Sequence, residues 1–203
     1  PVDSIVECTQ TKQSLLHRQA QLMAHVSQTI AVQDVLSSKN YCVLGFQYQQ
    51  MLEHLNLSAT AENLTIINHQ KWQHGLSSSI AKGVSALAKH SDAVLILLVD
   101  QWQLTCSDLL KIIKQWQQTP NKIHIASVEG CMLTPPVIFP KGYFNELTRL
   151  TGDDGAKSVI MRHEQSIIKC TMPSALADLD TPKQLADIQQ LALPSTQKRK
   201  EKA

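Results

Sequence analysis

Glycine is scarce in this chain: the 203 residues include seven, and none precedes Gly45. Residues 2–6 (VDSIV) have the composition of a buried first strand, and Lys12 stands just before an amphipathic segment. A phosphate-binding loop between a first strand and a first helix normally uses glycine, because only bare backbone approaches an anion closely. Residues 7–11 contain none, so the sequence as it stands excludes a glycine-rich loop at this position.

Other absences narrow the class of protein. The formal net charge is only +2, which gives no broad basic field and indicates no nucleic-acid partner. No long apolar run or signal peptide is visible, so we expect a cytoplasmic protein without a membrane partner. The cysteines are odd in number and form no C-x-x-C pair, which argues against a zinc site or a disulfide framework. They are Cys8, Cys42, Cys106, Cys131 and Cys170.

The chain is long enough for one domain with a real core and too short for two comfortable ones. The dense basic run QKRKEKA (residues 197–203) is typical of a solvated tail. We therefore predict a single domain over residues 1–194 and a flexible tail over residues 195–203.

Short apolar runs alternate with segments of helical spacing. Continuous apolar runs are typical of strands covered on both faces; they occur at residues 41–46, 64–68, 93–100, 122–128 and 166–170. Helical stripes lie between them. The first stripe has Leu15, Leu22, Val26 and Ile30; the second has Ile80, Val84 and Leu87; the third has Leu109, Ile112, Ile113 and Trp116. This alternation predicts an α/β fold, with three layers and a mostly parallel central sheet.

Ligands in such folds bind beyond the carboxyl ends of the strands. Asp100 ends the most hydrophobic run, LILLVD, and Gln101 follows it. A carboxylate at the mouth of a sheet needs compensation, and Mg²⁺ is a natural partner because it binds one or two carboxylates together with substrate phosphates. The alternative is that Asp100 caps the loop that follows.

A second acidic site precedes a predicted helix. Thr181 as N-cap, with Pro182 after it and Gln184 at the third position, is a strong helix start. Asp178 and Asp180 stand immediately before it. Asp180 either complements the helix dipole or faces Asp100 and shares one Mg²⁺ with it.

Two further segments combine glycine with polar side chains. In NHQKWQHGLSSS (residues 68–79), Gly75 and residues 77–79 enter a helix, where free N–H groups and hydroxyls suit an anion; serine-rich helix starts are also common without a ligand. In TGDDGAKSVI (residues 151–160), Asp153 or Asp154 is expected to cap another helix. The histidines show no metal-ligand spacing and no G-x-S-x-G elbow occurs, so hydrolase chemistry has no support.

Taken in order, four segments resemble the nucleotidyltransferases that mature the molybdenum cofactor, particularly the cytidylyltransferase branch. The family's N-P-x-W-x-x-G-x-x-S-S-L, D-A-V-L-x-L-L-G-D-Q-P-x-x-T, G-H-P-V-x-F-P with L-x-G-D-x-G-A-R, and D-I-D-T-P-E-D-L patterns have counterparts here. These are NHQKWQHGLSSSIAKGVSAL (68–87), DAVLILLVDQWQLT (92–105), PPVIFPKGYFNELTRLTGDDGAKSVIMRH (135–163) and ALADLDTPKQL (175–185).

The resemblance implies a Rossmann-like nucleotidyltransferase fold and a Mg²⁺-dependent transfer. The phosphate of molybdopterin would attack the α-phosphate of CTP or GTP, with release of pyrophosphate. Asp100 and Asp180 match the metal-binding positions, and Lys12 matches a lysine that contacts phosphates. Gly75, Ser77 and Ser78 match the loop on the cofactor side, and Gln101 follows the metal-binding aspartate. Of the two nucleotides, the resemblance favours CTP slightly over GTP. It also implies a molybdoenzyme or its maturation factor as the protein partner.

The departures from the family pattern leave three alternatives. The family's glycine- and arginine-bearing loop before Lys12 is missing, Val99 and Trp102 replace a glycine and a proline, and Pro135 replaces a histidine. In the first alternative, loop residues are omitted between Val6 and Thr11. In the second, the protein is an active enzyme with a redesigned loop. In the third, the chain is a degenerate relative that binds or delivers molybdenum cofactor without catalysis.

Overall fold

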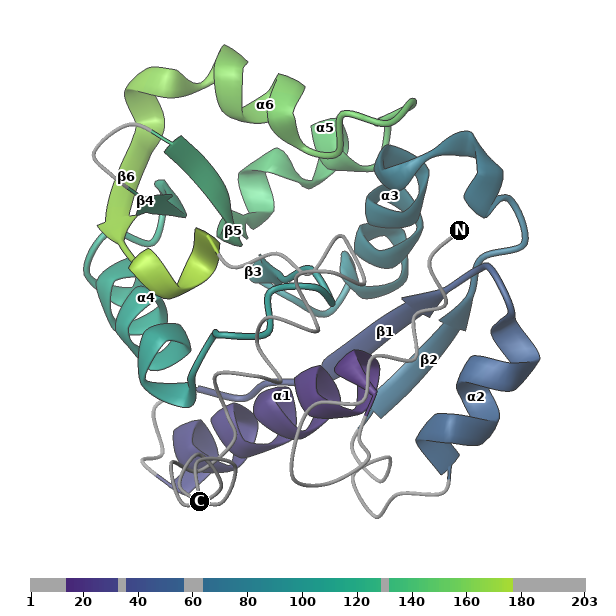
Figure 1. The fold of residues 1–203 in the computed structure, drawn as a ribbon. Helices are drawn as coiled ribbons and strands as arrows, with labels where there is room; N and C mark the ends of the chain where they lie inside the picture. The colour runs from purple at the N-terminus through teal and green to yellow at the C-terminus, as the bar shows by residue number, and fades with distance from the viewer. Residues whose placement is uncertain (1–13, 33–35, 57–63, 129–131, 177–203) are drawn as a thin grey trace, which may run out of the picture.

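The computed structural model describes residues 14–32, 36–56, 64–128 and 132–176 (Figure 1). The predicted opening strand at residues 2–6 and the predicted tail at residues 195–203 lie outside this part of the chain. Two sheets are described, one with strand order β1–β2 and one with strand order β3–β5–β4–β6. The strands are β1 (Asn40–Leu44), β2 (Leu64–Asn68), β3 (Ala93–Ile96), β4 (Ile123–Val128), β5 (Met132–Pro140) and β6 (Ile167–Thr171).

Strand direction is mostly uniform, as the sequence predicts. β1 pairs with β2 in parallel, and β4 pairs with β6 in parallel. β5 is antiparallel to both β3 and β4, so β3, β4 and β6 run in one direction and β5 alone runs in the other. The three-layer α/β fold is confirmed, with one reversed strand inserted in the larger sheet.

The reversed strand β5 is the element that the sequence analysis misses. It contains Pro135, Pro136 and Pro140, and proline normally argues against a central strand because it donates no ladder hydrogen bond. The register shows how it is accommodated: Ile125 pairs with Val137, but the next residue of β4 pairs with Thr134. The Pro135–Pro136 pair, joined by a cis peptide bond, therefore forms a bulge.

Helices cover both faces of the larger sheet (Figure 1). Ala126 and Val128 of β4 pack into one apolar cluster with α1 and α4, whereas Ile123 and Ile125 pack into another with α3, α5 and α6. The helices are α1 (Leu15–Val32), α2 (Tyr48–Asn56), α3 (Leu76–Leu87), α4 (Cys106–Gln118), α5 (Phe144–Leu147) and α6 (Lys157–Arg162). The alternation of side chains along β4 thus defines the three layers.

The three stripes found in the sequence become α1, α3 and α4. Their stripe residues include Val26, Val84 and Leu109, all of which are buried in the clusters. α4 also has a complete capping box, in which the Thr105 hydroxyl accepts from the Asp108 N–H and the Asp108 carboxylate accepts from the Thr105 N–H. Apolar spacing together with a cap fixes where this helix begins.

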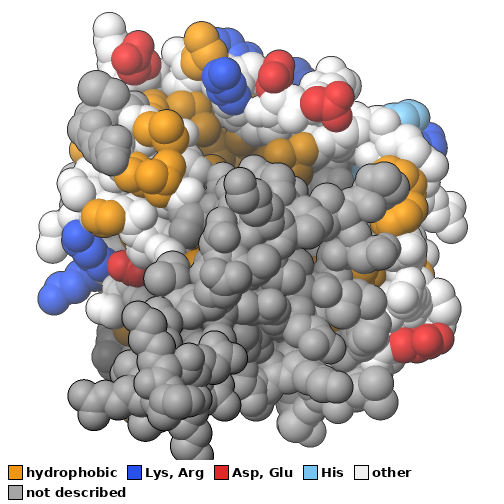
Figure 2. Space-filling view, viewed as in Figure 1, with side chains coloured by type: hydrophobic (Ala, Val, Ile, Leu, Met, Phe, Trp, Pro, Cys, Tyr) orange, Lys and Arg blue, Asp and Glu red, His pale blue; other side chains and the backbone are white. Residues whose placement is uncertain are grey.

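Two helices join the smaller sheet to the larger one. α1 contributes Ala20 to a cluster with Leu44 of β1 and with α2, and it also contributes to the cluster over the larger sheet. α3 approaches β1 closely at Gly83, where a Cβ atom would lie 3.1 Å from Val43 Cγ2. Among the described side chains visible in Figure 2, acidic and basic ones are interspersed. No described helix has the length and apolarity needed to cross a membrane.

Candidate functional site

Asp100 lies in a turn beyond β3. The sequence predicts a strand that reaches residue 100, but β3 ends at Ile96, and this boundary is a correction. The ladder stops there because Ile96 pairs with Val137, and the next residue of β5 in this direction is Pro136, which has no N–H to donate. The chain then turns, and the half-buried Asp100 is displayed four residues beyond the end of the strand.

Gln101 holds this turn in place. Its side chain is fully buried; Nε2 donates to the Ala175 carbonyl at 3.0 Å and to the Pro135 carbonyl at the β5 bulge. Its Oε1 accepts from the Leu98 N–H at 3.4 Å, and its backbone carbonyl accepts from Gln19 Nε2 of α1 at 2.8 Å. These partners occupy both ends of the amide and hold the turn that carries Asp100. The role of Gln101 as a nucleotide ligand stays a prediction.

Replacing Gln101 by Leu is expected to lower the free energy of unfolding by about 1–3 kcal/mol, because the Pro135 and Ala175 carbonyls lose a buried donor. The turn that carries Asp100 also loses its clamp, so turnover should fall more than the loss of folded protein explains. Urea unfolding and steady-state kinetics measure the two effects. Gln103→Leu, an exposed position in the same loop, is the matched control; equal behaviour of the two variants would refute the clamp.

The loop at the start of α3 is joined to the turn that precedes α6. Gly75 has φ +88°, and a Cβ atom there would lie 2.1 Å from Asp153 Oδ1 and 2.4 Å from the Gly152 carbonyl. The Ser77 N–H donates to the Gly152 carbonyl at 3.1 Å, and the Ser77 hydroxyl donates to the Gly155 carbonyl at 3.1 Å. Two segments that the sequence analysis treats separately thus form one unit.

This packing shows what Ser77 and Asp153 contact. Ser77 is buried and its hydroxyl is engaged with Gly155, so it supports the loop. The expectation that Asp153 or Asp154 caps the next helix is wrong, because the N-cap of α6 is Ala156 and no side-chain cap bond forms. Asp153 lies against Gly75 instead, and the acidic turn is part of the loop unit.

Ser78 is paired with a histidine that the sequence analysis does not single out. The Ser78 hydroxyl donates to the Gly75 carbonyl at 2.8 Å, so the 2.8 Å contact with His69 Nε2 requires the imidazole to be the donor. The pKa of the buried His69 is lowered, first by burial and then by neighbouring positive charges. Those charges belong to Lys82, His74 and Lys71. His69 immediately follows the last residue of β2, and this position beyond a strand end is the signal that identifies it.

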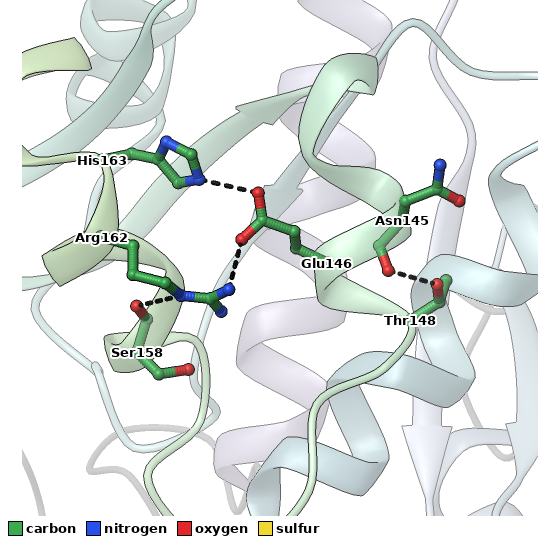
Figure 3. Close-up of polar contacts among 6 residues, drawn as sticks. All are labelled: Asn145, Glu146, Thr148, Ser158, Arg162 and His163. Carbon is green, nitrogen blue, oxygen red and sulfur yellow. Dashed lines mark hydrogen bonds and ion pairs between the residues drawn. The ribbon is translucent and has the colours of Figure 1, made fainter.

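A polar cluster fixes the helices on either side of the acidic turn (Figure 3). Glu146 of α5 contacts Arg162 Nη1 of α6 at 2.9 Å through Oε2, and His163 Nε2 at 2.7 Å through Oε1. Arg162 Nε also donates to the Ser158 carbonyl at 3.2 Å. Both oxygens of one carboxylate therefore hold the end of α6 against α5, with the 152–155 turn between the two helices.

Replacing Glu146 by Gln is expected to lower the free energy of unfolding by about 0.5–1 kcal/mol, because the pair with Arg162 is partly exposed and screened. The loss should shrink as salt concentration rises. Glu164→Gln, at an exposed position nearby, should leave the urea midpoint unchanged. A salt-independent loss, or none at all, would contradict the role given to this cluster.

Three of the predicted acidic or basic site residues, Lys12, Asp178 and Asp180, lie outside the described residues. Their roles stay predictions. Within the described ranges, no three His, Cys, Asp or Glu side chains gather in a group that would hold a metal ion. The structure thus places Asp100 with Gln101 on one loop, and Gly75, Ser77 and Ser78 at the N-cap and first turn of α3.

In α/β folds ligands bind beyond the carboxyl ends of the strands, and Asp100 lies beyond the carboxyl end of β3. The model of the MobA-like NTP transferase domain matches residues 8–167, and the chain belongs to this family. It is therefore a nucleotidyltransferase-family domain, and the resemblance to molybdenum cofactor nucleotidyltransferases is confirmed at the family level.

Similar proteins agree with this assignment. The purine catabolism protein PucB of Bacillus subtilis (strain 168) is 29% identical over 114 residues, which are 55% of this chain and about half (52%) of PucB. A nucleotidyl transferase from Methanothermobacter (Mth528) superposes with a TM-score of 0.70 and 13% identity, covering 94% of this chain and 85% of that chain. Rv0371c of Mycobacterium tuberculosis H37Rv, solved in complex with manganese, superposes with a TM-score of 0.66 and 16% identity, covering 93% of this chain and 92% of that chain. At these identities the structures show the shared fold.

Proposed function

We propose that this protein is a Mg²⁺-dependent nucleotidyltransferase that moves a CMP or GMP group from CTP or GTP to the phosphate of molybdopterin. An oxygen of the acceptor phosphate forms a bond to the α-phosphorus. The bond from the α-phosphorus to the bridging oxygen breaks, and pyrophosphate leaves with the bonding electrons. Such a transfer needs in-line positioning and charge neutralisation rather than a protein nucleophile.

The observation that carries the proposal is the half-buried Asp100, held by the fully buried Gln101 on a turn beyond β3. A carboxylate oxygen is the ligand type that Mg²⁺ prefers, and Mg²⁺ commonly completes its shell with water and substrate phosphates. Asp100 therefore fits as one protein ligand, and Asp180 is the proposed second. The metal, when bound, would neutralise charge that develops on the phosphates.

We place the triphosphate of CTP or GTP between Lys12 and Asp100, and the contact between α1 and the turn that carries Asp100 supports this placement. Arg18 Nη2 donates to the Leu104 carbonyl at 3.4 Å, and Gln19 Nε2 donates to the Gln101 carbonyl. The first turns of α1 are thereby tied to the loop that carries Asp100. In the sequence Lys12 stands three positions before Leu15, the first residue of α1, which supports its proposed role as a phosphate-binding residue.

The alternative is a non-catalytic relative that holds molybdenum cofactor for a molybdoenzyme or its maturation factor. Val99 and Trp102, which replace the glycine and proline of the family pattern beside Asp100, favour it. Incubation with molybdopterin, Mg²⁺ and each nucleoside triphosphate in turn separates the two. Pyrophosphate release with CTP or GTP supports the enzyme; binding of the acceptor without release, with every nucleotide, supports the alternative.

A further inference from the structure

A cavity of about 300 Å³ lies against α5 and α6, outside the residues assigned to transfer. Small-molecule sites in proteins have volumes of about 300–1,000 Å³, so the cavity is large enough for a small ligand. Five of its six lining side chains are charged or carry a hydroxyl group, which indicates a polar ligand. The lining consists of Glu146, Arg149, Leu150, Thr151, Ser158 and Arg162.

Arg162 is held in a defined orientation at the cavity (Figure 3). Its Nη1 contacts Glu146 Oε2 at 2.9 Å, and its Nε donates to the Ser158 carbonyl at 3.2 Å. A guanidinium group has five N–H donors, so these two contacts leave donors for a ligand. The Arg162 side chain is 58% exposed, and a ligand from solvent can therefore reach these donors.

Arg149 adds a positive charge to the cavity without a described counter-ion. Its backbone N–H donates to the Glu146 carbonyl at 3.1 Å, which places it beside α5. Its side chain is exposed, and within the described residues its guanidinium group has no hydrogen-bond or ion-pair partner. Glu146, the one carboxylate of the lining, contacts Arg162 and His163 with its two oxygens. The lining thus has two positive charges and one negative charge, and this excess suits an anion.

The cavity and the turn that carries Asp100 are attached to opposite faces of the larger sheet. Leu150, which lines the cavity, belongs to the apolar cluster with α3, α5 and α6. Leu104, at the end of the loop that carries Asp100, belongs to the cluster with α1 and α4. None of the lining residues is among those assigned to the metal or to the nucleotide phosphates.

We propose that this cavity is a second ligand site, which binds phosphate or a phosphate monoester apart from the transfer site. The phosphate oxygens accept hydrogen bonds from Arg149 and from the remaining N–H groups of Arg162, because the planar guanidinium fork matches phosphate geometry. The Ser158 and Thr151 hydroxyls provide further donors. Leu150 provides an apolar contact for the organic part of a monoester. Binding at this site does not depend on the proposed transfer reaction.

An NMR titration with inorganic phosphate tests this site directly. Two-dimensional ¹H–¹⁵N spectra of the full chain are recorded without Mg²⁺, with chloride replaced by phosphate at constant ionic strength. The amide signals of residues 149–151 and 158–162 are expected to shift and to reach saturation. Glycerol 3-phosphate is the second probe: tighter binding than inorganic phosphate identifies a monoester as the ligand, and equal or weaker binding identifies phosphate itself.

Arg149→Gln is expected to weaken phosphate binding by about 10- to 100-fold, because a charge-assisted contact is lost. Arg149→Lys keeps the charge without the fork and should weaken binding less. Lys114→Gln removes one positive charge at an exposed position of α4, on the other face of the sheet, and should leave binding unchanged. Urea unfolding confirms that each variant is folded.

Three results would overturn the site: no shift of these amide signals in the wild type, shifts confined to residues 97–104, or equal phosphate binding by the wild type and folded Arg149→Gln. None of them bears on the transfer reaction, because no readout of the titration requires turnover. Absence of turnover would likewise leave the titration to decide whether the cavity binds phosphate.

Discussion

Replacing Asp100 by Asn is expected to reduce Mg²⁺-dependent turnover by at least about 100-fold, because loss of a metal ligand should cost more than loss of a residue that only orients one. The amide keeps the shape of the side chain but removes the charge that a divalent cation requires. Asp100 is half-buried in a turn beyond β3, so the free energy of unfolding should change by less than about 1 kcal/mol. Steady-state kinetics across a Mg²⁺ titration measure the loss.

Asp92→Asn is the matched control for this variant. Asp92 directly precedes β3, its side chain is 95% exposed, and its pair with Lys141 is long at 4.0 Å. The same chemical change at the other end of the strand should therefore leave turnover and its Mg²⁺ dependence intact. Near-normal activity of Asp100→Asn would show that the metal assignment is wrong, whereas equal losses in both variants would indicate a general electrostatic effect.

Replacing Gly75 by Ala is expected to lower the free energy of unfolding by about 2–4 kcal/mol, because strain and overpacking act together. The residue has a positive φ of +88°, and the new methyl group would meet the Gly152 carbonyl and the Asp153 carboxylate. The segment before α3 would have to move away from the 152–155 turn, so any ligand contact made by Gly75, Ser77 and Ser78 should weaken as well. Thermal and urea unfolding measure the stability loss.

Gly142→Ala provides the comparison for this prediction. A Cβ atom on Gly142 meets nothing within 4 Å, so the free energy of unfolding should stay within about 0.5 kcal/mol of wild type. If Gly75→Ala were as stable as Gly142→Ala, the contact between the loop before α3 and the 152–155 turn would not be a supporting feature of the fold.

Local patterns in the sequence are sufficient to predict the helices α1, α3 and α4, because each has an apolar stripe that faces the sheet. β5 is harder to predict because its prolines argue against a strand, and only the bulge opposite Ile125 and Ala126 makes them compatible with the ladder. The same bulge explains why β3 is shorter than its apolar run indicates. Strand boundaries therefore depend on the partner strand as much as on composition.

The site is predicted in part for a similar reason. The sequence places Asp100 near a strand end and Gly75 at a helix start, and the structure confirms these positions, whereas their roles in binding stay predictions. The role of Gln101 depends on Gln19, Pro135 and Ala175, which are 82, 34 and 74 positions away in the sequence. No local pattern predicts such a set of contacts. His69 follows β2, but the sequence pattern does not single it out, because a histidine there fits no metal-ligand or catalytic spacing.

The most direct test of the account is transfer of the nucleotide itself. The full chain is incubated with Mg²⁺, molybdopterin and CTP or GTP labelled in the α-phosphate, and the label is followed by chromatography and mass spectrometry. We predict that the label appears in a molybdopterin dinucleotide, in amounts equal to the pyrophosphate released, and that Asp100→Asn forms none while Asp92→Asn forms it normally. Label that stays in the nucleotide with both substrates, under conditions where molybdopterin is bound, would contradict the account.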